Sequence, residues 1–139
     1  MMIYGSKEMA HDDKNNRYVA PVWQLDTDSF TVIHTDPKTL ETESYTFTSD
    51  YIREFISYNM GKDPRVIERL VESGRIYSYL DELEERCITQ VDKQARMWAE
   101  KDKGYIAARE RGDILTQSRI FNGLELNAKH ELMRVLIYR

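Results

Sequence analysis

The sequence is poor in the residues that crosslink a fold or bind metal ions. Cysteine occurs once, at Cys87, so no disulfide can form within the chain, and histidine occurs three times. A single cysteine usually behaves as a small buried apolar residue, and we interpret Cys87 as part of the core. Since disulfides accumulate in oxidising compartments, their absence favours a reducing one, and we expect a cytoplasmic protein.

Long apolar runs are also missing. No stretch approaches the roughly 20 apolar residues that a membrane-spanning helix needs. The segment from Met1 to His11 lacks the apolar core of a secretory signal. We therefore expect no membrane association.

Positive charge is not in excess. The formal net charge of the chain is −4; residues 1–50 carry −5 and residues 51–139 carry +1. Nucleic-acid binders rely on basic surfaces that neutralise phosphates, so this balance argues against a dedicated nucleic-acid binder. Solubility alone would also explain the acidic N-terminal part.

Catalytic and cofactor-binding motifs are absent from the sequence. Gly104, Gly112 and Gly123 are isolated, so there is no glycine-rich loop to bind a phosphate. No serine lies in a nucleophile elbow, and no histidine has a cysteine or carboxylate at zinc-ligand spacing. The HDD run at 11–13 has the composition of a metal site, but an exposed turn explains it better. We predict no enzymatic activity, no cofactor and no metal.

Strand patterns fill the first third of the chain. Polar residues 11–17 predict a turn. Three segments rich in β-branched and aromatic residues follow, Tyr18–Leu25, Ser29–His34 and Ser44–Thr48, and they predict a three-stranded antiparallel meander. Pro21 cannot donate a backbone hydrogen bond, so the first segment is predicted to be an edge or bulged strand.

Helical spacing replaces the strand pattern from Ser49 onward. Ser49 or Asp50 is predicted to cap a helix that ends near Tyr58, with Tyr51, Phe55 and Tyr58 on one face.

A second, shorter helix is predicted after Asp63-Pro64, because proline is tolerated at the first helical position. Ile67, Leu70 and Val71 would form its buried stripe. Ser73-Gly74 is predicted to end it, with Gly74 at positive φ.

Two longer helices complete the predicted fold, one over residues 75–101 and one after a break at Gly104. Their predicted buried positions are Ile76, Leu80, Leu83, Cys87, Val91, Ala95 and Trp98 in the first, and Ile114, Phe121, Leu124, Ala128, Leu132 and Val135 in the second. A short connection should place them antiparallel, with Trp98 and Phe121 buried in the seam.

The predicted fold class is therefore α+β. A small N-terminal antiparallel β-meander, within residues 1–48, packs on a helical region, residues 49–139, that is dominated by a long antiparallel helical hairpin. We expect residues 1–139 to form one domain, because domains usually hold about 100–150 residues.

Short motifs occur in a fixed order in the helical region. They are Ser73–Leu80 (SGRIYSYL), the DELEE run at 81–85, Ala99-Glu100, the positions Asp113, Arg119, Asn122 and Ala128, and the closing Leu136-Ile137-Tyr138. Over residues 51–139, with one residue inserted near Gly104, the chain resembles the TnpV proteins, which are encoded within bacterial transposons and related integrated elements. The resemblance extends weakly to Tyr18–Pro21, and Gln117 stands where the family commonly has tryptophan. That family has no established biochemical activity, so the resemblance implies a mobile genetic element and no particular chemistry.

An acidic cluster on the first long helix is the candidate protein-binding site. The candidate residues are Tyr77, Tyr79, Asp81, Glu82, Glu84 and Glu85. Clustered carboxylates imitate phosphates or contact a basic partner. The alternative explanation is favourable charge in the N-terminal half of a helix.

Basic residues around the predicted hairpin tip are the candidate nucleic-acid contacts. They are Lys93, Arg96, Lys101, Lys103, Arg109 and Arg111. Such residues bind phosphates, but long basic side chains also cover apolar surface while their charged ends stay in water.

These features predict a non-enzymatic accessory protein of a mobile element. It would bind another protein and modulate a nucleic-acid-handling complex. One version is an anti-CRISPR-like inhibitor of a host defence nuclease, since the guide and target channels of such nucleases are basic. The alternative is a DNA-binding transposition accessory factor.

Overall fold

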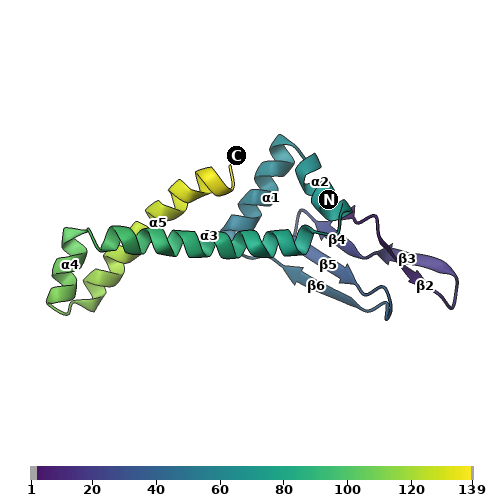
Figure 1. Cartoon of the computed structure of the whole chain (residues 1–139), viewed down its shortest axis with the longest axis horizontal. Coiled ribbons are helices and arrows are strands. Elements are labelled where there is room, and N and C mark those ends of the chain that lie inside the picture. Colours follow the sequence, from purple (N-terminus) through teal and green to yellow (C-terminus); the bar gives the residue numbers. More distant parts are fainter. Residues whose placement is uncertain (1–2, 139) are drawn as a thin grey trace. The chain divides into compact units, whose positions relative to one another are not determined.

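The computed structural model describes residues 3–138; residues 1, 2 and 139, at the ends of the predicted single domain, lie outside the described residues. Within the described residues six strands precede five helices, so the predicted α+β class is confirmed. Figure 1 shows the strands early in the chain and the helices after them. The chain divides between Leu83 and Glu84 into two compact units, which we call the first unit and the second unit. This division falls within a helix, whereas the change from strands to helices comes near residue 48.

The first unit contains a four-stranded antiparallel sheet in the order β1-β4-β5-β6. Figure 1 shows three of these strands, β4, β5 and β6, side by side. Its strands are β1 (Ile3–Gly5), β4 (Trp23–Asp26), β5 (Thr31–Thr35) and β6 (Thr42–Thr46). The last three form the predicted meander. The sequence patterns did not predict β1, which pairs with β4.

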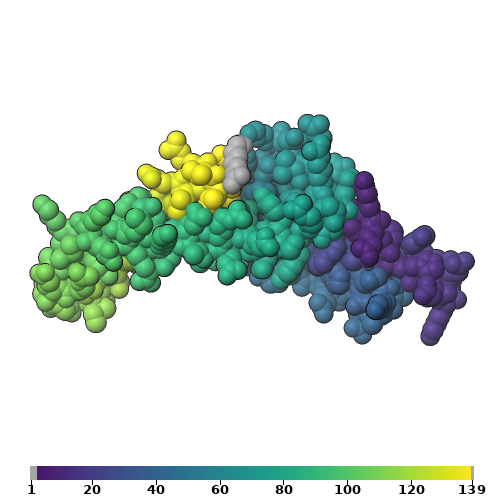
Figure 2. All heavy atoms as spheres, viewed as in Figure 1, coloured from purple at the N-terminus to yellow at the C-terminus, as the bar shows by residue number. Residues whose placement is uncertain are grey.

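A separate two-stranded hairpin, β2 (Met9–Asp12) and β3 (Arg17–Pro21), lies at one end of the first unit (Figure 2). The predicted turn over residues 11–17 is therefore shorter than expected. The predicted strand Tyr18–Leu25 is also wrong, because it is two strands in different sheets. Since Pro21 has no N–H for a ladder, β3 ends there and the chain passes through Val22 into β4.

The helix α1 (Asp50–Lys62) extends one turn beyond the predicted end near Tyr58. The Ser49 hydroxyl accepts the backbone N–H of Tyr51 at 3.2 Å, so Ser49 is the cap. Of the three residues predicted on one face, Phe55 is buried, and Tyr51 and Tyr58 are half-buried. The other buried positions are Ile52, Ile56 and Asn59. Isoleucine has no polar atom to satisfy, whereas each tyrosine hydroxyl favours a place near water.

The helix α2 (Arg65–Glu72) begins and ends as the sequence predicts. The Asp63 carboxylate accepts the backbone N–H of Arg65 at 3.2 Å, and Pro64 has helical dihedral angles. Ile67 and Val71 are buried, while Leu70 is half-buried.

The turn after α2 requires a glycine. Gly74 has φ +75°, its N–H donates to the Val71 carbonyl at 3.0 Å, and the Arg75 N–H donates to the Leu70 carbonyl at 3.0 Å. These two bonds form a Schellman motif, in which the left-handed residue is usually glycine.

Replacing Gly74 by alanine should lower the free energy of unfolding by about 1 kcal/mol, because alanine is strained at positive φ. The added Cβ would also lie 3.3 Å from a ring carbon of Trp23. Chemical denaturation followed by circular dichroism measures the change. Gly61→Ala is the matched control, since nothing lies within 4 Å of its added Cβ. Equal midpoints for Gly74→Ala and the wild type would contradict the prediction.

The long helix α3 (Ile76–Ala99) carries the predicted stripe. Its predicted buried positions from Ile76 to Ala95 are all buried, which confirms that part of the stripe. Trp98, in contrast, is half-buried, and Ala99 takes the buried position beside it.

In the second unit, the part of α3 after Leu83 packs with α5 (Ile114–Leu136) as the predicted hairpin (Figure 1). Their connection is not a simple break at Gly104, because it contains the helix α4 (Lys103–Glu110). Asp102 caps α4 by accepting the Tyr105 N–H at 2.8 Å. A Cβ on Gly104 would lie 3.3 Å from the end of Ile120, so glycine allows α4 to approach α5 closely.

The buried face of α5 differs from the predicted one at most positions, since Phe121, Leu124 and Leu132 are half-buried and the two end positions are exposed. Ala128 is buried as predicted, but Ile114 and Val135 are 72% and 64% exposed. Met133 and Leu136 are buried instead. A helix advances by 3.6 residues per turn, so a stripe extended over many turns drifts away from the contact face.

Phe121, like Trp98, is half-buried, so neither ring of the predicted seam is completely buried. The Arg96 guanidinium lies 5.6 Å from the centre of the Phe121 ring and covers part of it. Replacing either Phe121 or Trp98 by alanine should therefore cost less than the roughly 3–5 kcal/mol of a fully buried ring.

Asp113 caps α5 through a charged carboxylate. The Thr116 hydroxyl and backbone N–H donate to it at 2.6 and 3.1 Å, and these bonds, with Arg111 nearby, hold the pKa of Asp113 below its ordinary value.

Because the pKa of Asp113 is lower in the folded state, its contribution to stability is present above the unfolded value, about 3.9. That contribution is lost as the pH falls through the folded pKa. Asp113→Ala should therefore lower the melting temperature near neutral pH, and its difference from the wild type should narrow in acid. Thermal melts across this pH range measure it. Asp113→Asn, which retains an acceptor, is the control. A difference in melting temperature between Asp113→Ala and the wild type that does not change with pH would contradict the prediction.

Candidate functional site

The acidic segment of α3 comprises Asp81, Glu82, Glu84 and Glu85. Asp81, Glu82 and Glu85 are exposed, and Glu84 is half-buried. No ion pair within residues 3–138 involves the three exposed carboxylates. The first turn of α3 contains no acidic residue, so these charges do not act directly on the exposed N–H groups of the helix end.

The two tyrosines predicted beside this segment have different environments. Tyr79 packs on Phe55 with ring centroids 5.6 Å apart, so it belongs to the packing between helices. Tyr77 lies one turn before Asp81, which places both on the same side of α3. The ring of Tyr77 also contacts two aromatic residues of the sheet, Trp23 and Tyr45, so Tyr77 packs against the sheet as well.

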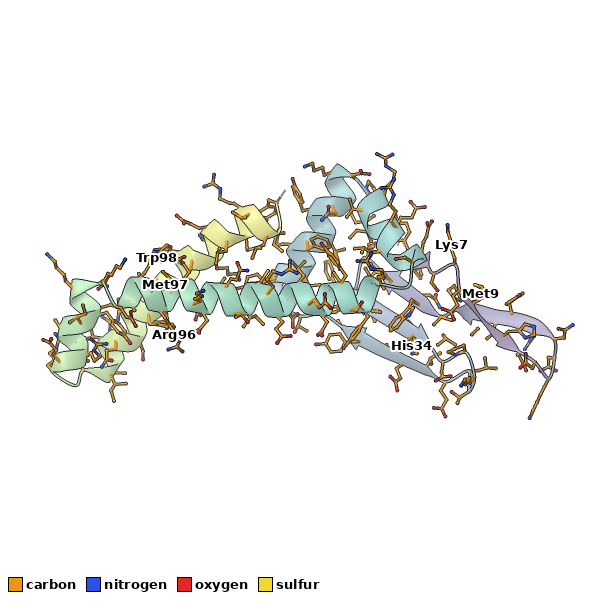
Figure 3. The ribbon with its side chains drawn as sticks, in the orientation of Figure 1. Lys7, Met9, His34, Arg96, Met97 and Trp98 are labelled. Atoms are coloured by element: carbon orange, nitrogen blue, oxygen red, sulfur yellow. The ribbon has the colours of Figure 1, made fainter. Side chains whose placement is uncertain are left out.

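An aromatic pocket on the sheet was not predicted from the sequence. It has a volume of about 270 Å³ and lies wholly within the first unit. Its main lining residues are Trp23, His34, Glu43, Tyr45 and Tyr77. His34, marked in Figure 3, projects from β5, and its ring centroid lies 4.3 Å from that of Trp23.

Strand register brings the pocket residues together. His34 is paired with Trp23 on one side and with Glu43 on the other, so the three side chains form a row on one face. Tyr45 stands two residues along β6 on the same face. Each residue alone resembles an ordinary strand residue, and only the pairing of three strands would have revealed the group.

The six basic candidates are all exposed, but several are already engaged. Arg96, near the C-terminal end of α3 (Figure 3), donates to Asp92 at 2.8 Å, which raises the pKa of Arg96. Arg111 donates to Asp113 at 3.2 Å. Arg109 lies over the Tyr105 ring at 6.0 Å.

The remaining three, Lys93, Lys101 and Lys103, make no ion pair within the described part of the chain. Acidic residues alternate with them, including Glu100 and Asp102. The tip of the hairpin is therefore a mixed surface. A uniform basic surface would suit phosphate binding better.

The remaining residues considered as metal ligands or nucleophiles are the histidines and the single cysteine. Among residues 3–138, no three His, Cys, Asp or Glu side chains are grouped as metal ligands. His11, in β2, contacts Asp13 of the exposed β2–β3 turn at 2.7 Å. Cys87 is buried, and this burial raises the pKa of its thiol.

Within residues 3–138, none of the helices combines the length and the apolar character required to cross a bilayer. Comparisons of the chain with family models, with curated proteins and with solved structures found no match.

Proposed function

We propose that the chain acts, without catalysis, by binding a protein partner through the acidic segment of α3 and thereby modulating a nucleic-acid-handling complex. The observation that carries the proposal is the set of exposed carboxylates on Asp81, Glu82 and Glu85, which have no ion pair among the described residues. They lie on α3 opposite its buried stripe, where a partner can reach them.

The wider charge distribution supports a basic partner. Residues 1–83 carry nine basic and fifteen acidic side chains, a net charge of −6. A negative surface is repelled by phosphates and is attracted to the basic grooves in which proteins bind nucleic acids. This attraction raises the rate of association with such a protein. The resemblance to TnpV proteins supports a mobile element as the setting, where a host defence nuclease with basic channels would be such a partner.

The test compares wild type with a variant carrying lysine at all four positions of the acidic segment. Proteins captured from the native host by the wild type are purified, and their association with each form is measured by surface plasmon resonance. We expect association with the variant to be at least about tenfold slower, since electrostatic steering is lost. Nuclease or nucleic-acid-binding activity of the captured partner is then measured with and without the protein.

A control variant carries lysine at three acidic positions outside α3, Asp13, Asp28 and Glu41, so its charge change is three quarters of that in the test variant. It should bind the partner nearly as well as the wild type. Circular dichroism verifies that both variants keep their helices. If both variants weakened partner binding equally, total charge and not the acidic segment would be responsible. Full binding of the partner by the α3 variant would contradict the proposal.

Lys93, Lys101 and Lys103 are available for the alternative, a DNA-binding transposition accessory factor. Fluorescence anisotropy with labelled duplex DNA separates the two functions. The alternative would give submicromolar binding that weakens steeply with salt and requires Lys101 and Lys103. We expect no such binding at physiological salt.

A further inference from the structure

The outer side of β6 is an open sheet edge. β6 is the last strand of the sheet, and all five of its residues are exposed. Exposed edges can pair with an extended segment of another protein.

The hydrogen-bond pattern shows which backbone groups face outward. At one end of the β5–β6 ladder the Phe47 N–H donates to the Phe30 carbonyl at 2.9 Å. At the other end the Asp36 N–H donates to the Glu41 carbonyl at 2.8 Å. Hydrogen-bonded pairs alternate along an antiparallel ladder, so residues 43 and 45 also bond inward to β5. The N–H and C=O groups of residues 42, 44 and 46 are therefore directed away from β5.

The aromatic pocket lies directly beside this edge. Two of its lining side chains, Glu43 and Tyr45, come from β6 itself. Its volume of about 270 Å³ is below the range of about 300–1,000 Å³ for pockets that hold a drug-sized molecule. A pocket of this size, next to a strand edge, suits one side chain of a paired segment.

The chemistry of the pocket favours a cation. The ring centroid of Tyr77 lies 6.0 Å from that of Trp23 and 5.8 Å from that of Tyr45, so three aromatic rings stand close together. Aromatic faces attract ammonium and guanidinium groups. The exposed Glu43 carboxylate makes no ion pair among residues 3–138 and adds a full negative charge.

We propose that an extended segment of a partner protein pairs with β6 and inserts a lysine or arginine side chain into this pocket. Backbone bonds to Ser44 align the segment. One residue of the segment pairs with Ser44. Because successive side chains of a strand alternate, the residues just before and just after it project to the pocket face. A second copy of the chain would not supply the cation through β6, which contains Glu43 and no basic residue. This site is distinct from the acidic segment of α3 and does not depend on it.

The test is selection from a library of bead-displayed random nonapeptides with the purified full chain. We expect the enriched peptides to share one lysine or arginine flanked by β-branched residues. For a resynthesised peptide, affinity should fall about tenfold with Tyr45→Ala and when the basic residue is replaced by norleucine. N-methylation of the peptide residue that pairs with Ser44 should abolish binding, and the Ser44 amide should exchange more slowly in the complex.

Glu43→Gln should weaken binding, while Glu41→Gln, which lies outside β6 and the pocket, should leave it unchanged. Thermal melts of each variant verify folding. Lack of enrichment, enriched peptides without a shared basic residue, insensitivity to N-methylation, or dimerisation of the chain through β6 would each overturn the proposal. Lysine substitution of the acidic segment of α3 should leave peptide binding intact, so that the two proposed surfaces are tested separately.

Discussion

Replacing Phe47 by alanine is expected to lower the free energy of unfolding by about 3–5 kcal/mol, the cost of removing a large buried ring. Phe47 directly follows β6 and is only 1% exposed. Its ring meets the edge of Tyr45 at a centroid distance of 4.8 Å and lies 6.2 Å from Tyr77. The truncation leaves a cavity that the paired strands cannot close without breaking their hydrogen bonds. Guanidinium denaturation followed by circular dichroism and tryptophan fluorescence measures the loss.

The matched control is Tyr18→Ala in β3, where the side chain is 69% exposed. Surface substitutions usually change stability by less than about 0.5 kcal/mol. A loss of similar size for Tyr18 and Phe47 would show that Phe47 does not belong to the core of the first unit.

Replacing Leu80 by alanine should lower the free energy of unfolding by about 2–5 kcal/mol. Leu80 is fully buried on α3, in the part of the helix that belongs to the first unit. Alanine has a slightly higher helix propensity than leucine, so any loss reflects packing and not the helix itself. Denaturation curves give the value.

Ile88→Ala on the same helix is the control, because Ile88 is 52% exposed. We expect a change of less than about 1 kcal/mol there. If Ile88→Ala cost more than Leu80→Ala, the buried and exposed faces of α3 would be reversed.

Sequence patterns predicted most of the helical features that depend on near neighbours. The Ser49 cap, the Asp63-Pro64 start and the positive φ of Gly74 are confirmed, because each depends on residues within one turn of the helix end. The buried stripe of α3 is confirmed up to Ala95, because it follows the helical repeat of a single segment.

Predictions failed where burial or pairing depends on distant residues. Ile114 and Val135 fit the apolar spacing of α5 but are exposed, since a stripe extended over many turns drifts away from the contact face. The strand β2 was not predicted, because a short polar strand is stabilised mainly by the strand it pairs with.

The candidate sites show the same contrast. The acidic segment of α3 could be found in the sequence, because its residues are consecutive or nearly so and helical spacing alone places them on one side. The aromatic pocket could not, because Trp23, His34 and Glu43 meet only when β4, β5 and β6 pair in one register. A shift of one residue would turn these side chains to the other face. Local propensity and periodicity thus determined the change from strands to helices, the Ser49 cap, the Asp63-Pro64 start, the Gly74 turn and the α3 stripe. Long-range pairing and packing decided the strand number, the division into two units and the pocket, since these require contacts between residues far apart in the chain.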